Sequence, residues 1–367
     1  MNKKMKIFEI IPQLGSGGGE RFTVDLCNEL VRRGHDVTLV VLHELNDTTS
    51  FYRDELITEV KVISMNKRMG FDWRLLFRLY ELIKKQFPYI VHTHLRGIMY
   101  SALSILMNRS SMYYHTVHTT ADREASSSID ILVRRFFFKQ GWVTPVTISK
   151  ESHRSFVEFY KMDAPLIVNG RNIPENILVS VFIRQEIEAY KMTSNTKILI
   201  QLARMEKVKR HTLMAHVVKR LVNEGFDIAL LMIGHKNELY VEEIDKLNCT
   251  AIYILGEKHN ILEYLSMADA YCLCSSYEGM PISLIEALGT STIPICTPVG
   301  GVINTVEDGV NGFLSSDLTE ESYYQALKRF LLLNDEKLVT MKRKVRESYK
   351  LYSMTECGTK YEKLFMR

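Results

Sequence analysis

Two carboxylates, Glu278 and Glu286, stand on either side of Pro281 in the stretch SSYEGMPISLIEAL, residues 275–288. Proline suits the first turn of a helix, so Glu278 is predicted in the preceding loop and Glu286 in the second helical turn. Ionised carboxylates only accept hydrogen bonds, which suits them to binding the hydroxyls of a sugar or a ribose. Ordinary helix capping explains an acid at the start, but it does not explain Glu286 among apolar residues.

A glycine-rich loop near the N-terminus could bind an anion. The loop GSGGGE, residues 15–20, follows an apolar segment and opens a predicted helix. Glycine lets the backbone approach an anion closely, and the first N–H groups of a helix attract negative charge. The spacing is not GxGxxG, because Glu20 takes the last position. The alternative interpretation is a tight turn between a strand and a helix.

A basic loop, ARMEKVKRH at residues 203–211, follows the first predicted strand of the second half. It places Arg204 and Lys209 five positions apart, and a guanidinium with an ammonium can neutralise a diphosphate. Basic side chains in a surface loop are more often only solvated, so this loop alone does not establish a site.

Four histidines raise the alternative of a metal site. His92 and His94 share one face of a predicted strand, and His115 and His118 lie near the end of the next one. We find no acidic or cysteine ligand pattern near them, and therefore expect no bound metal. Local hydrogen bonding is the preferred interpretation for His92 and His115.

The elements that must position these residues alternate along the chain. Short β-branched runs such as KIFEII and DVTLVVL alternate with amphipathic stretches, which predicts right-handed βαβ crossovers and parallel sheets. The pattern loosens between residues 165 and 196 and then begins again at TKILIQL. We therefore expect an α/β protein with two doubly wound domains in tandem, and ligands at the carboxyl ends of the strands. The tail from residue 320 is predicted to be helical.

Composition excludes several classes of protein. The chain has 367 residues, 46% of them hydrophobic, and a net charge of +4, which is too mild to indicate nucleic acid as a partner. The six cysteines form no CxxC pair and no zinc-ligand spacing, so we expect them to be reduced and buried. No segment approaches the roughly 20 apolar residues that span a bilayer, and we expect a cytoplasmic protein.

Several of these motifs together resemble a known family. YEGMPISLIEALGTSTIPICTPVGG at residues 277–301, VEDGVNGFL at 306–314, GGGERFTVDLCNELVRRGHDVTLVV at 17–41 and the basic loop are similar to the retaining glycosyltransferases of family 4, also called the group 1 family. The resemblance covers nearly the whole chain. It departs at Ser291, where the family usually has glycine.

The resemblance implies a GT-B fold, with two Rossmann-like domains that face a cleft. The expected division is an acceptor-binding domain over residues 1–170, a donor-binding domain over 171–345 and a C-terminal helix over 346–367 that packs on the first domain. It also implies transfer of a sugar with retention, commonly explained by front-face attack in which the leaving phosphate accepts the proton of the acceptor. Positioning then carries much of the rate.

The resemblance also implies roles for residues of the second half. Arg204 and Lys209 would bind the donor diphosphate and stabilise the charge on it as it leaves. Glu286 would bind the ribose hydroxyls. Glu278 and the N–H groups of Gly279 and Met280 would contact the transferred sugar.

In the first half, the resemblance assigns backbone N–H groups of Gly17, Gly18 and Gly19 to the donor. It places His118, in TVHTTAD, near the sugar and the acceptor. The implied catalytic set is His118, Arg204, Lys209 and Glu278. No metal and no tightly bound cofactor are implied, and the donor substrate is expected to be a UDP- or GDP-sugar.

The implied acceptor is a carbohydrate or a lipid-linked glycan, in the synthesis of a cell-surface polysaccharide. Peripheral contact with the inner face of the plasma membrane is expected through VRRFFFKQGW, residues 133–142, which combines Arg134, Arg135 and Lys139 with aromatic residues. The alternative is a helix buried beneath one charged face.

Two other functions stay open on the sequence alone. An NAD-dependent oxidoreductase would use the glycine loop, Glu44 at the end of the second predicted strand, and the Y-x3-K pair of Tyr80 and Lys84. That interpretation leaves the residues from Arg204 to Glu286 without a role. The other alternative is a non-catalytic protein that binds a sugar nucleotide, or a partner subunit of a transferase.

Overall fold

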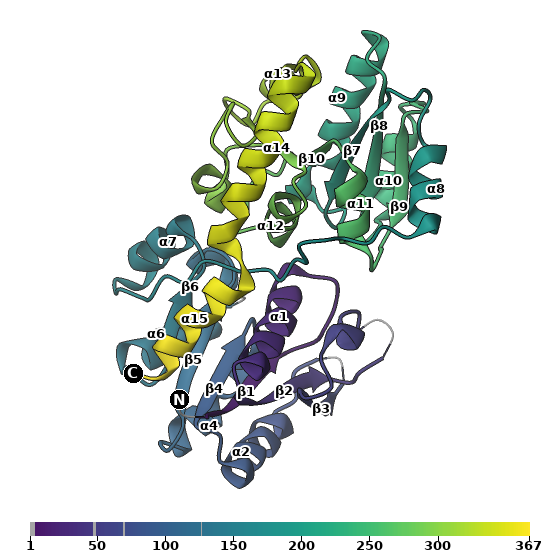
Figure 1. The fold of residues 1–367 in the computed structure, drawn as a ribbon. Coiled ribbons are helices and arrows are strands. Elements are labelled where there is room, and N and C mark those ends of the chain that lie inside the picture. Colours follow the sequence, from purple (N-terminus) through teal and green to yellow (C-terminus); the bar gives the residue numbers. More distant parts are fainter. Residues whose placement is uncertain (1–3, 47–48, 69, 126) are drawn as a thin grey trace. The chain divides into compact units, whose positions relative to one another are not determined.

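The structure is a computed structural model that describes residues 4–46, 49–68, 70–125 and 127–367. The chain forms two compact units (Figure 1). The first contains Met1–Asn172 together with Met354–Arg367, and the second contains Ile173–Ser353. The boundaries expected from the sequence lay after residues 170 and 345.

A six-stranded sheet forms the centre of the first unit, with the strand order β3-β2-β1-β4-β5-β6. All neighbouring strands are parallel. The strands are β1 Lys6–Ile11, β2 Asp36–His43, β3 Lys61–Lys67, β4 Ile90–His94, β5 Met112–Val117 and β6 Thr144–Thr147. The order reverses between β1 and β4, so the carboxyl ends of these two central strands lie at the switch point where ligands of such sheets bind.

Helices connect these strands. They are α1 Gly18–Arg32, α2 Arg74–Gln86, α3 Gly97–Tyr100, α4 Ala102–Met107, α5 Ala121–Glu124, α6 Ser128–Lys139 and α7 Lys150–Tyr160, with a short 3-10 turn η1 at Arg53–Glu55. The last helix of the chain, α15 Met354–Phe365, lies beside α1 (Figure 1). Arg33 donates to Oε2 of Glu362 at 3.1 Å and so ties the two helices together.

The second unit has its own six-stranded parallel sheet, with the order β12-β11-β10-β7-β8-β9. Its strands are β7 Lys197–Leu202, β8 Ile228–Ile233, β9 Ile252–Gly256, β10 Ala270–Leu273, β11 Ile293–Cys296 and β12 Phe313–Leu314. Its helices are α8 Val181–Ala189, α9 His211–Asn223, α10 Glu238–Asp245, α11 Ile261–Met267, α12 Ile282–Gly289, α13 Glu320–Leu331 and α14 Asp335–Tyr349, with 3-10 turns η2 Lys207–Lys209, η3 Gly300–Asn304 and η4 Lys350–Tyr352.

The fold predicted from the alternating pattern is confirmed. Both sheets are parallel and flanked by helices, and residues 320–367 contain helices and one 3-10 turn. Strands of a parallel sheet are covered on both faces, which explains their continuous apolar runs. In β1, for example, Ile7, Phe8, Ile10 and Ile11 are all fully buried. Glu9 is equally buried in the middle of this strand, and it is therefore the residue that needs a separate explanation.

Candidate functional site

In the second unit, Glu278 lies in the loop between β10 and α12. Its side chain is 7% exposed, and its Oε1 accepts hydrogen bonds from Oγ of Ser275 at 2.6 Å and from Nζ of Lys209 at 2.7 Å. The structure thus brings together Lys209 and Glu278, which are 69 positions apart in the chain. Lys209 lies in the loop after β7 and Glu278 in the loop after β10. These two strands are parallel neighbours, so both residues lie beyond the carboxyl ends of the strands.

The backbone around Lys209 is fixed to the strands beneath it. The side-chain amide of Gln201, in β7, donates to the carbonyl oxygen of Lys209 at 3.0 Å. The N–H of Ser276 donates to the carbonyl oxygen of Val208 at 2.8 Å, which joins this basic loop to the loop of Glu278. These backbone bonds hold the basic loop at the place from which the ammonium group reaches Glu278.

A glycine after β11 fixes the other side of the Glu278 loop. Gly300 has φ +50°, and a Cβ there would overlap the carbonyl oxygen of Glu278 and lie 2.7 Å from its carbonyl carbon. The N–H of Gly301 donates to the carbonyl oxygen of Gly279 at 2.7 Å. Only glycine permits this approach, because any side chain would displace the loop that carries the carboxylate.

Arg204 directly follows β7 in the same way. Gly234, directly after β8, has φ +146°, and a Cβ there would overlap the carbonyl oxygen of Ala203 and lie 3.0 Å from the backbone nitrogen of Arg204. The guanidinium of Arg204 remains 53% exposed and lies 3.4 Å from the carboxylate of Glu206. An accessible cation therefore stands at the carboxyl end of a central strand, where a ligand can reach it.

The predicted positions around Pro281 agree with the structure. Glu278 lies in the loop, Pro281 directly precedes α12, and Glu286 is the fifth residue of that helix. Glu286 is buried, as is Met280, whose sulfur lies 3.8 Å from Oγ1 of Thr305. The two carboxylates belong to one loop-and-helix segment, and Glu278 is the one that bonds Lys209.

The glycine loop and His118 come together in the first unit. Gly17 is the N-cap of α1 and Gly18 its first residue. A Cβ at Gly19 would lie 3.6 Å from Cγ and Nδ1 of His118, so this edge of the imidazole faces the first turn of α1. The carboxylate of Glu20 folds against Gly17. A phosphate at this loop would therefore approach a carboxylate as well as N–H groups.

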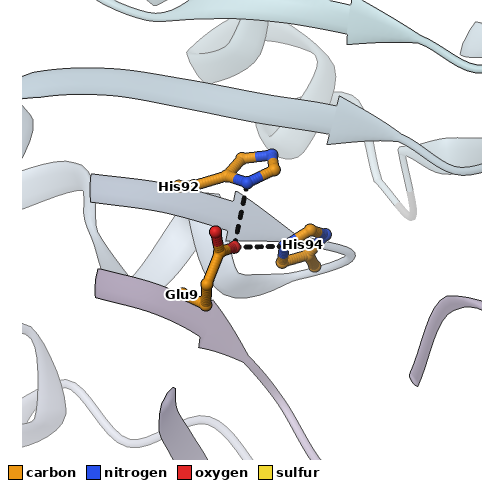
Figure 2. A group of neighbouring side chains, drawn as sticks. All are labelled: Glu9, His92 and His94. Atoms are coloured by element: carbon orange, nitrogen blue, oxygen red, sulfur yellow. Dashed lines mark hydrogen bonds and ion pairs between the residues drawn. The ribbon is translucent and has the colours of Figure 1, made fainter. Parts of the chain in front are cut away.

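His118 is linked to a buried carboxylate through His94. Nε2 of His118 lies 2.9 Å from Nδ1 of His94, and Nε2 of His94 lies 2.7 Å from Oε2 of Glu9. The same oxygen of Glu9 lies 2.9 Å from Nδ1 of His92 (Figure 2). No acidic residue was expected near these histidines, and that expectation was wrong, because Glu9 supplies a carboxylate. Glu9, His92 and His94 also form a group whose ligand atoms lie within 4.8 Å of one another.

Local hydrogen bonding is confirmed for His92 and His115. Nε2 of His92 bonds Oγ1 of Thr116 at 2.8 Å, and Nδ1 of His115 bonds Oγ1 of Thr93 at 2.9 Å. Burial lowers the pKa of His92 to about 3. Burial likewise lowers the pKa of His118 to about 4, so both imidazoles are neutral near pH 7.

Sequence reasoning missed Glu9, Gly234 and Gly300 as residues that shape the two sites. Glu9 carried a visible indication, because a charged residue in the middle of KIFEII has no solvent to face in a central parallel strand. Gly234 and Gly300 gave a weaker indication in the sequence. Their positive φ values follow from approaches to chain segments that are distant in sequence.

The basic and aromatic segment 133–142 is only partly as expected. Arg134 is fully buried and donates from Nε to Oδ1 of Asp130 at 2.5 Å, so its assignment to a membrane surface was wrong. Phe137 and Phe138 belong to the core. On the outer side of α6, a separate apolar stripe is exposed, formed by Ile129, Leu132 and Phe136.

Features of the oxidoreductase alternative have ordinary surface environments. Glu44 is exposed. Nζ of Lys84 lies 5.6 Å from the ring centroid of Tyr80 one turn away on α2, which is a packing contact on a helix surface.

The six cysteines carry free thiols, and all but Cys249 are buried. No helix in the described parts of the chain combines the length and the apolar character that crossing a bilayer requires.

Two family models match the chain, one in each unit. Residues 16–173 match the model of Glycosyltransferase Family 4, and residues 182–348 match that of Glycosyl transferases group 1. Together the matched segments cover both sheets apart from β1, the first strand of the first unit.

Two relatives match nearly the whole chain. The chain is 24% identical over 363 residues to the N-acetyl-alpha-D-glucosaminyl L-malate synthase of Bacillus anthracis, which covers 95% of this chain and 93% of that protein. It is 23% identical to the UDP-Gal:alpha-D-GlcNAc-diphosphoundecaprenol alpha-1,3-galactosyltransferase of Escherichia coli, over 93% of this chain and 90% of that one.

Solved structures share the fold across the whole chain. A glycosyltransferase from Rickettsia africae superposes with a TM-score of 0.83 at 20% identity, over 99% of this chain and 98% of that one. The Anabaena protein HepE, solved with UDP and glucose, superposes with a TM-score of 0.82 at 13% identity, over 99% of each chain.

Proposed function

Since this chain belongs to the group 1 glycosyltransferase family and is itself a glycosyltransferase of GT-B fold, we propose that it transfers a sugar from a nucleotide-sugar donor, with retention of the anomeric configuration. The donor is a UDP- or GDP-sugar, and the acceptor is a carbohydrate or a lipid-linked glycan of a cell-surface polysaccharide. No tightly bound cofactor and no metal take part in this proposal.

The observation that carries the proposal is the contact of Lys209 with Glu278 at the carboxyl ends of β7 and β10. A donor offers a diphosphate beside a sugar rich in hydroxyls. An ammonium suits the first and a carboxylate suits the second, and here the two groups touch. Glu286, on α12, is assigned to the ribose hydroxyls, and the N–H groups of Gly279 and Met280 to the transferred sugar.

Charge stabilisation is the main catalytic device that we propose. Negative charge develops on the diphosphate as the bond from the anomeric carbon to its oxygen breaks. Arg204 and Lys209 meet that charge, and the leaving phosphate oxygen takes the proton of the attacking hydroxyl. This route needs no nucleophile from the protein. It does need a cation that the diphosphate can reach, and the guanidinium of Arg204 is exposed.

From the first unit, we assign His118 to a hydroxyl of the sugar or the acceptor, and N–H groups of Gly17, Gly18 and Gly19 to the donor phosphates. His118 is a neutral imidazole that lies beside Gly19. A neutral imidazole offers one donor and one acceptor, which suits it to a hydroxyl.

The acceptor class is supported by the names of relatives. The galactosyltransferase of Escherichia coli acts on a diphosphoundecaprenol-linked sugar. A Campylobacter jejuni relative, 24% identical over 90% of each chain, is named as an N-acetyl-D-galactosaminyltransferase for a PP-undecaprenol-linked glycan. A lipid-linked acceptor would place the reaction at the inner face of the plasma membrane.

Peripheral membrane contact is proposed through α6. The exposed stripe of Ile129, Leu132 and Phe136 is followed by the exposed Lys139, which suits an anionic lipid surface. Flotation with phosphatidylglycerol vesicles should carry the wild-type protein upward and should fail for the Leu132→Glu variant. Val339→Glu, which changes an exposed apolar residue of α14, is the matched control.

The function is tested by release of nucleoside diphosphate from a panel of sugar nucleotides, with candidate acceptors present and absent. The correct donor should first be found by thermal shift, because a ligand of the folded state raises the melting temperature. Arg204→Ala should chiefly slow transfer, by roughly a hundredfold or more, and Glu286→Gln should weaken donor binding. Stabilisation without any acceptor-dependent release would instead support the non-catalytic binding protein.

A further inference from the structure

Three side chains from three neighbouring strands form a continuous path in the first unit. Glu9 lies in β1, His94 ends β4 and His118 directly follows β5. The contacts are 2.7 Å from Oε2 of Glu9 to Nε2 of His94, and 2.9 Å from Nδ1 of His94 to Nε2 of His118. Glu9 and His94 are fully buried, whereas His118 is half-buried and reaches the first turn of α1.

The direction of these hydrogen bonds follows from the carboxylate. An ionised Glu9 only accepts, so His94, whose Nε2 bonds Oε2 of Glu9, must donate from Nε2. A neutral His94 with its proton on Nε2 has a bare Nδ1, which accepts. His118 must then donate from Nε2, and its own Nδ1 carries no proton and can accept a hydrogen bond.

We propose that Glu9 is a positioning residue that acts through His94 to hold His118 in the Nε2–H form, with Nδ1 presented as a hydrogen-bond acceptor beside Gly19. This inference rests on the proposed role of His118 toward a substrate hydroxyl. It adds a selection rule to that role: the hydroxyl that meets His118 must donate its proton to Nδ1. Glu9 and His94 touch no substrate in this arrangement.

The backbone of His118 has separate support, so the path through His94 governs the ring. The N–H of His118 donates to Oε2 of Glu124 at 3.2 Å. Ring contacts with Phe22, 5.6 Å between centroids, restrict its tilt from the side of α1. Neither contact selects a tautomer, because neither involves a nitrogen of the ring. His94 is the neighbour that does.

The distances are too short for ligand atoms that share a metal ion. Ligand atoms around a tetrahedral zinc ion, each bonded at about 2.0–2.1 Å, lie roughly 3.3 Å apart. Here Oε2 of Glu9 lies at 2.7 Å and 2.9 Å from the two histidine nitrogens. The second nitrogen of His92 bonds Thr116, whose hydroxyl bonds Tyr361 of α15 at 2.7 Å, so the network continues into the core.

The first test measures tautomers in the ligand-free full-length protein, independently of activity. Long-range ¹H–¹⁵N spectra of histidine-labelled protein at pH 8 should show His118 protonated at Nε2 and bare at Nδ1. Burial raises the pKa of Glu9, and the hydrogen bond from His94 opposes this, so an alkaline pH keeps the carboxylate ionised. Signals are assigned by single His→Gln variants.

Two variants break the path and one matched control does not. Glu9→Leu and His94→Phe should each leave His118 in mixed tautomers. His92→Gln removes an equally buried neighbour of the same Glu9 oxygen and leaves the three side chains of the path in place, so it should leave His118 in the Nε2–H form. An Nδ1–H tautomer in the wild type, or an unchanged tautomer in both path variants, overturns the proposal. So does a stoichiometric metal ion in the purified protein, detected by elemental analysis.

The second test asks whether Glu9 acts through His118. Losing an orienting partner of a functional histidine typically costs about 10–100-fold, so Glu9→Leu should lower kcat by that factor with the KM for donor little changed. In the His118→Ala background the same change should cost almost nothing. An equal loss in both backgrounds overturns the proposal. If no donor and acceptor pair gives turnover at all, the proposed function fails, while the tautomers still decide this inference.

Discussion

Nζ of Lys209 lies 2.7 Å from Oε1 of Glu278, with the side chains 22% and 7% exposed. A nearly buried carboxylate needs such a cation, because an uncompensated charge away from water is costly. The same ammonium is the group that we assign to the donor diphosphate. A diphosphate in this position therefore competes with Glu278 for Lys209, and the pair describes the ligand-free state of the second unit.

This competition predicts opposite effects of Glu278→Gln on two ligands. The variant frees Lys209 and removes a negative charge, so binding of the nucleoside diphosphate should tighten by about 1 kcal/mol, roughly fivefold. Transfer should fall by about a hundredfold, because the sugar loses its charged acceptor. Isothermal titration and initial rates measure the two.

Glu206→Gln provides the control for that variant, since Glu206 is a carboxylate of the same loop that is exposed and pairs with Arg204 at 3.4 Å. It should leave transfer nearly unchanged. Weaker binding of the diphosphate to the Glu278→Gln variant would show that Lys209 and Glu278 do not share this ligand.

Gly300 and Gly309 allow two costs of an added methyl group to be compared, the steric overlap and the unfavourable backbone φ. Gly300→Ala should lower the free energy of unfolding of the second unit by about 3 kcal/mol, because it adds an overlap with the Glu278 carbonyl to an unfavourable φ of +50°. Gly309 has φ +75°, and the nearest atom to a Cβ there is a guanidinium nitrogen of Arg329 at 3.9 Å. Gly309→Ala should therefore cost only about 1–2 kcal/mol.

Calorimetry gives both unfolding free energies, and titration with donor gives the functional effect. Donor binding should be lost in Gly300→Ala and kept in Gly309→Ala, provided that each is measured below its own transition. Equal losses of stability in the two variants would mean that the Glu278 loop yields to the added methyl group without strain.

The turn after α12 is strained at Ser291. This residue has φ +62°, the left-handed region that glycine adopts freely. Ser291→Gly should stabilise the second unit by about 0.5–1 kcal/mol, which is the left-handed penalty less the chain entropy of glycine. Asn248, with φ +49°, is a matched control, because asparagine tolerates this region and Asn248→Gly should gain little.

Much of the fold is written in local patterns. KIFEII coincides with β1, and DVTLVVL and TKILIQL agree with β2 and β7 to within one residue. Continuous apolar runs between amphipathic stretches are enough for this, since parallel strands are covered on both faces. The two-residue β12 was missed because Phe313 and Leu314 are too few to form a pattern.

Relationships between distant segments could not be obtained this way. Glu9 meets His94 across 85 positions, and Glu278 meets Lys209 across 69. Sequence motifs identified the loops that carry Arg204 and Glu278, but they did not show that the two loops contact each other. Gly234 and Gly300 lie against the backbone of these two loops, and these contacts form only in the folded chain. Arg134 shows the same limit, because its charge indicated a surface and its partner Asp130 places it inside.

The buried histidines make the first unit sensitive to acid. Burial holds the pKa values of His92 and His118 at about 3 and about 4, and those of His94 and His115 well below the usual value. His92 and His118 are therefore neutral when folded and protonated when unfolded between about pH 6.5 and pH 4, and the lowered pKa values of His94 and His115 act in the same direction. Since the unfolded chain binds more protons in this window, stability is full above about pH 6.5 and is lost as the pH falls.

Glu9 opposes this trend, because its raised pKa means that the folded chain keeps a proton which the unfolded chain has released. Glu9 acts against these four histidines and against His43, whose pKa burial also lowers, so the net effect keeps its sign. Each neutral histidine contributes up to about 1.4 kcal/mol per pH unit. Urea unfolding between pH 7.5 and pH 5.5 should therefore show a falling midpoint.

Tryptophan fluorescence makes this measurement specific, because both tryptophans of the chain, Trp73 and Trp142, belong to the first unit. His115→Phe removes one of these titrating groups and should reduce the slope of stability against pH. His216→Phe changes an exposed histidine of the second unit and should leave it unaltered. A urea midpoint that stays constant or rises toward pH 5.5 would show that the buried histidines of the first unit are protonated in the folded state, with the Glu9 carboxylate as counter-ion.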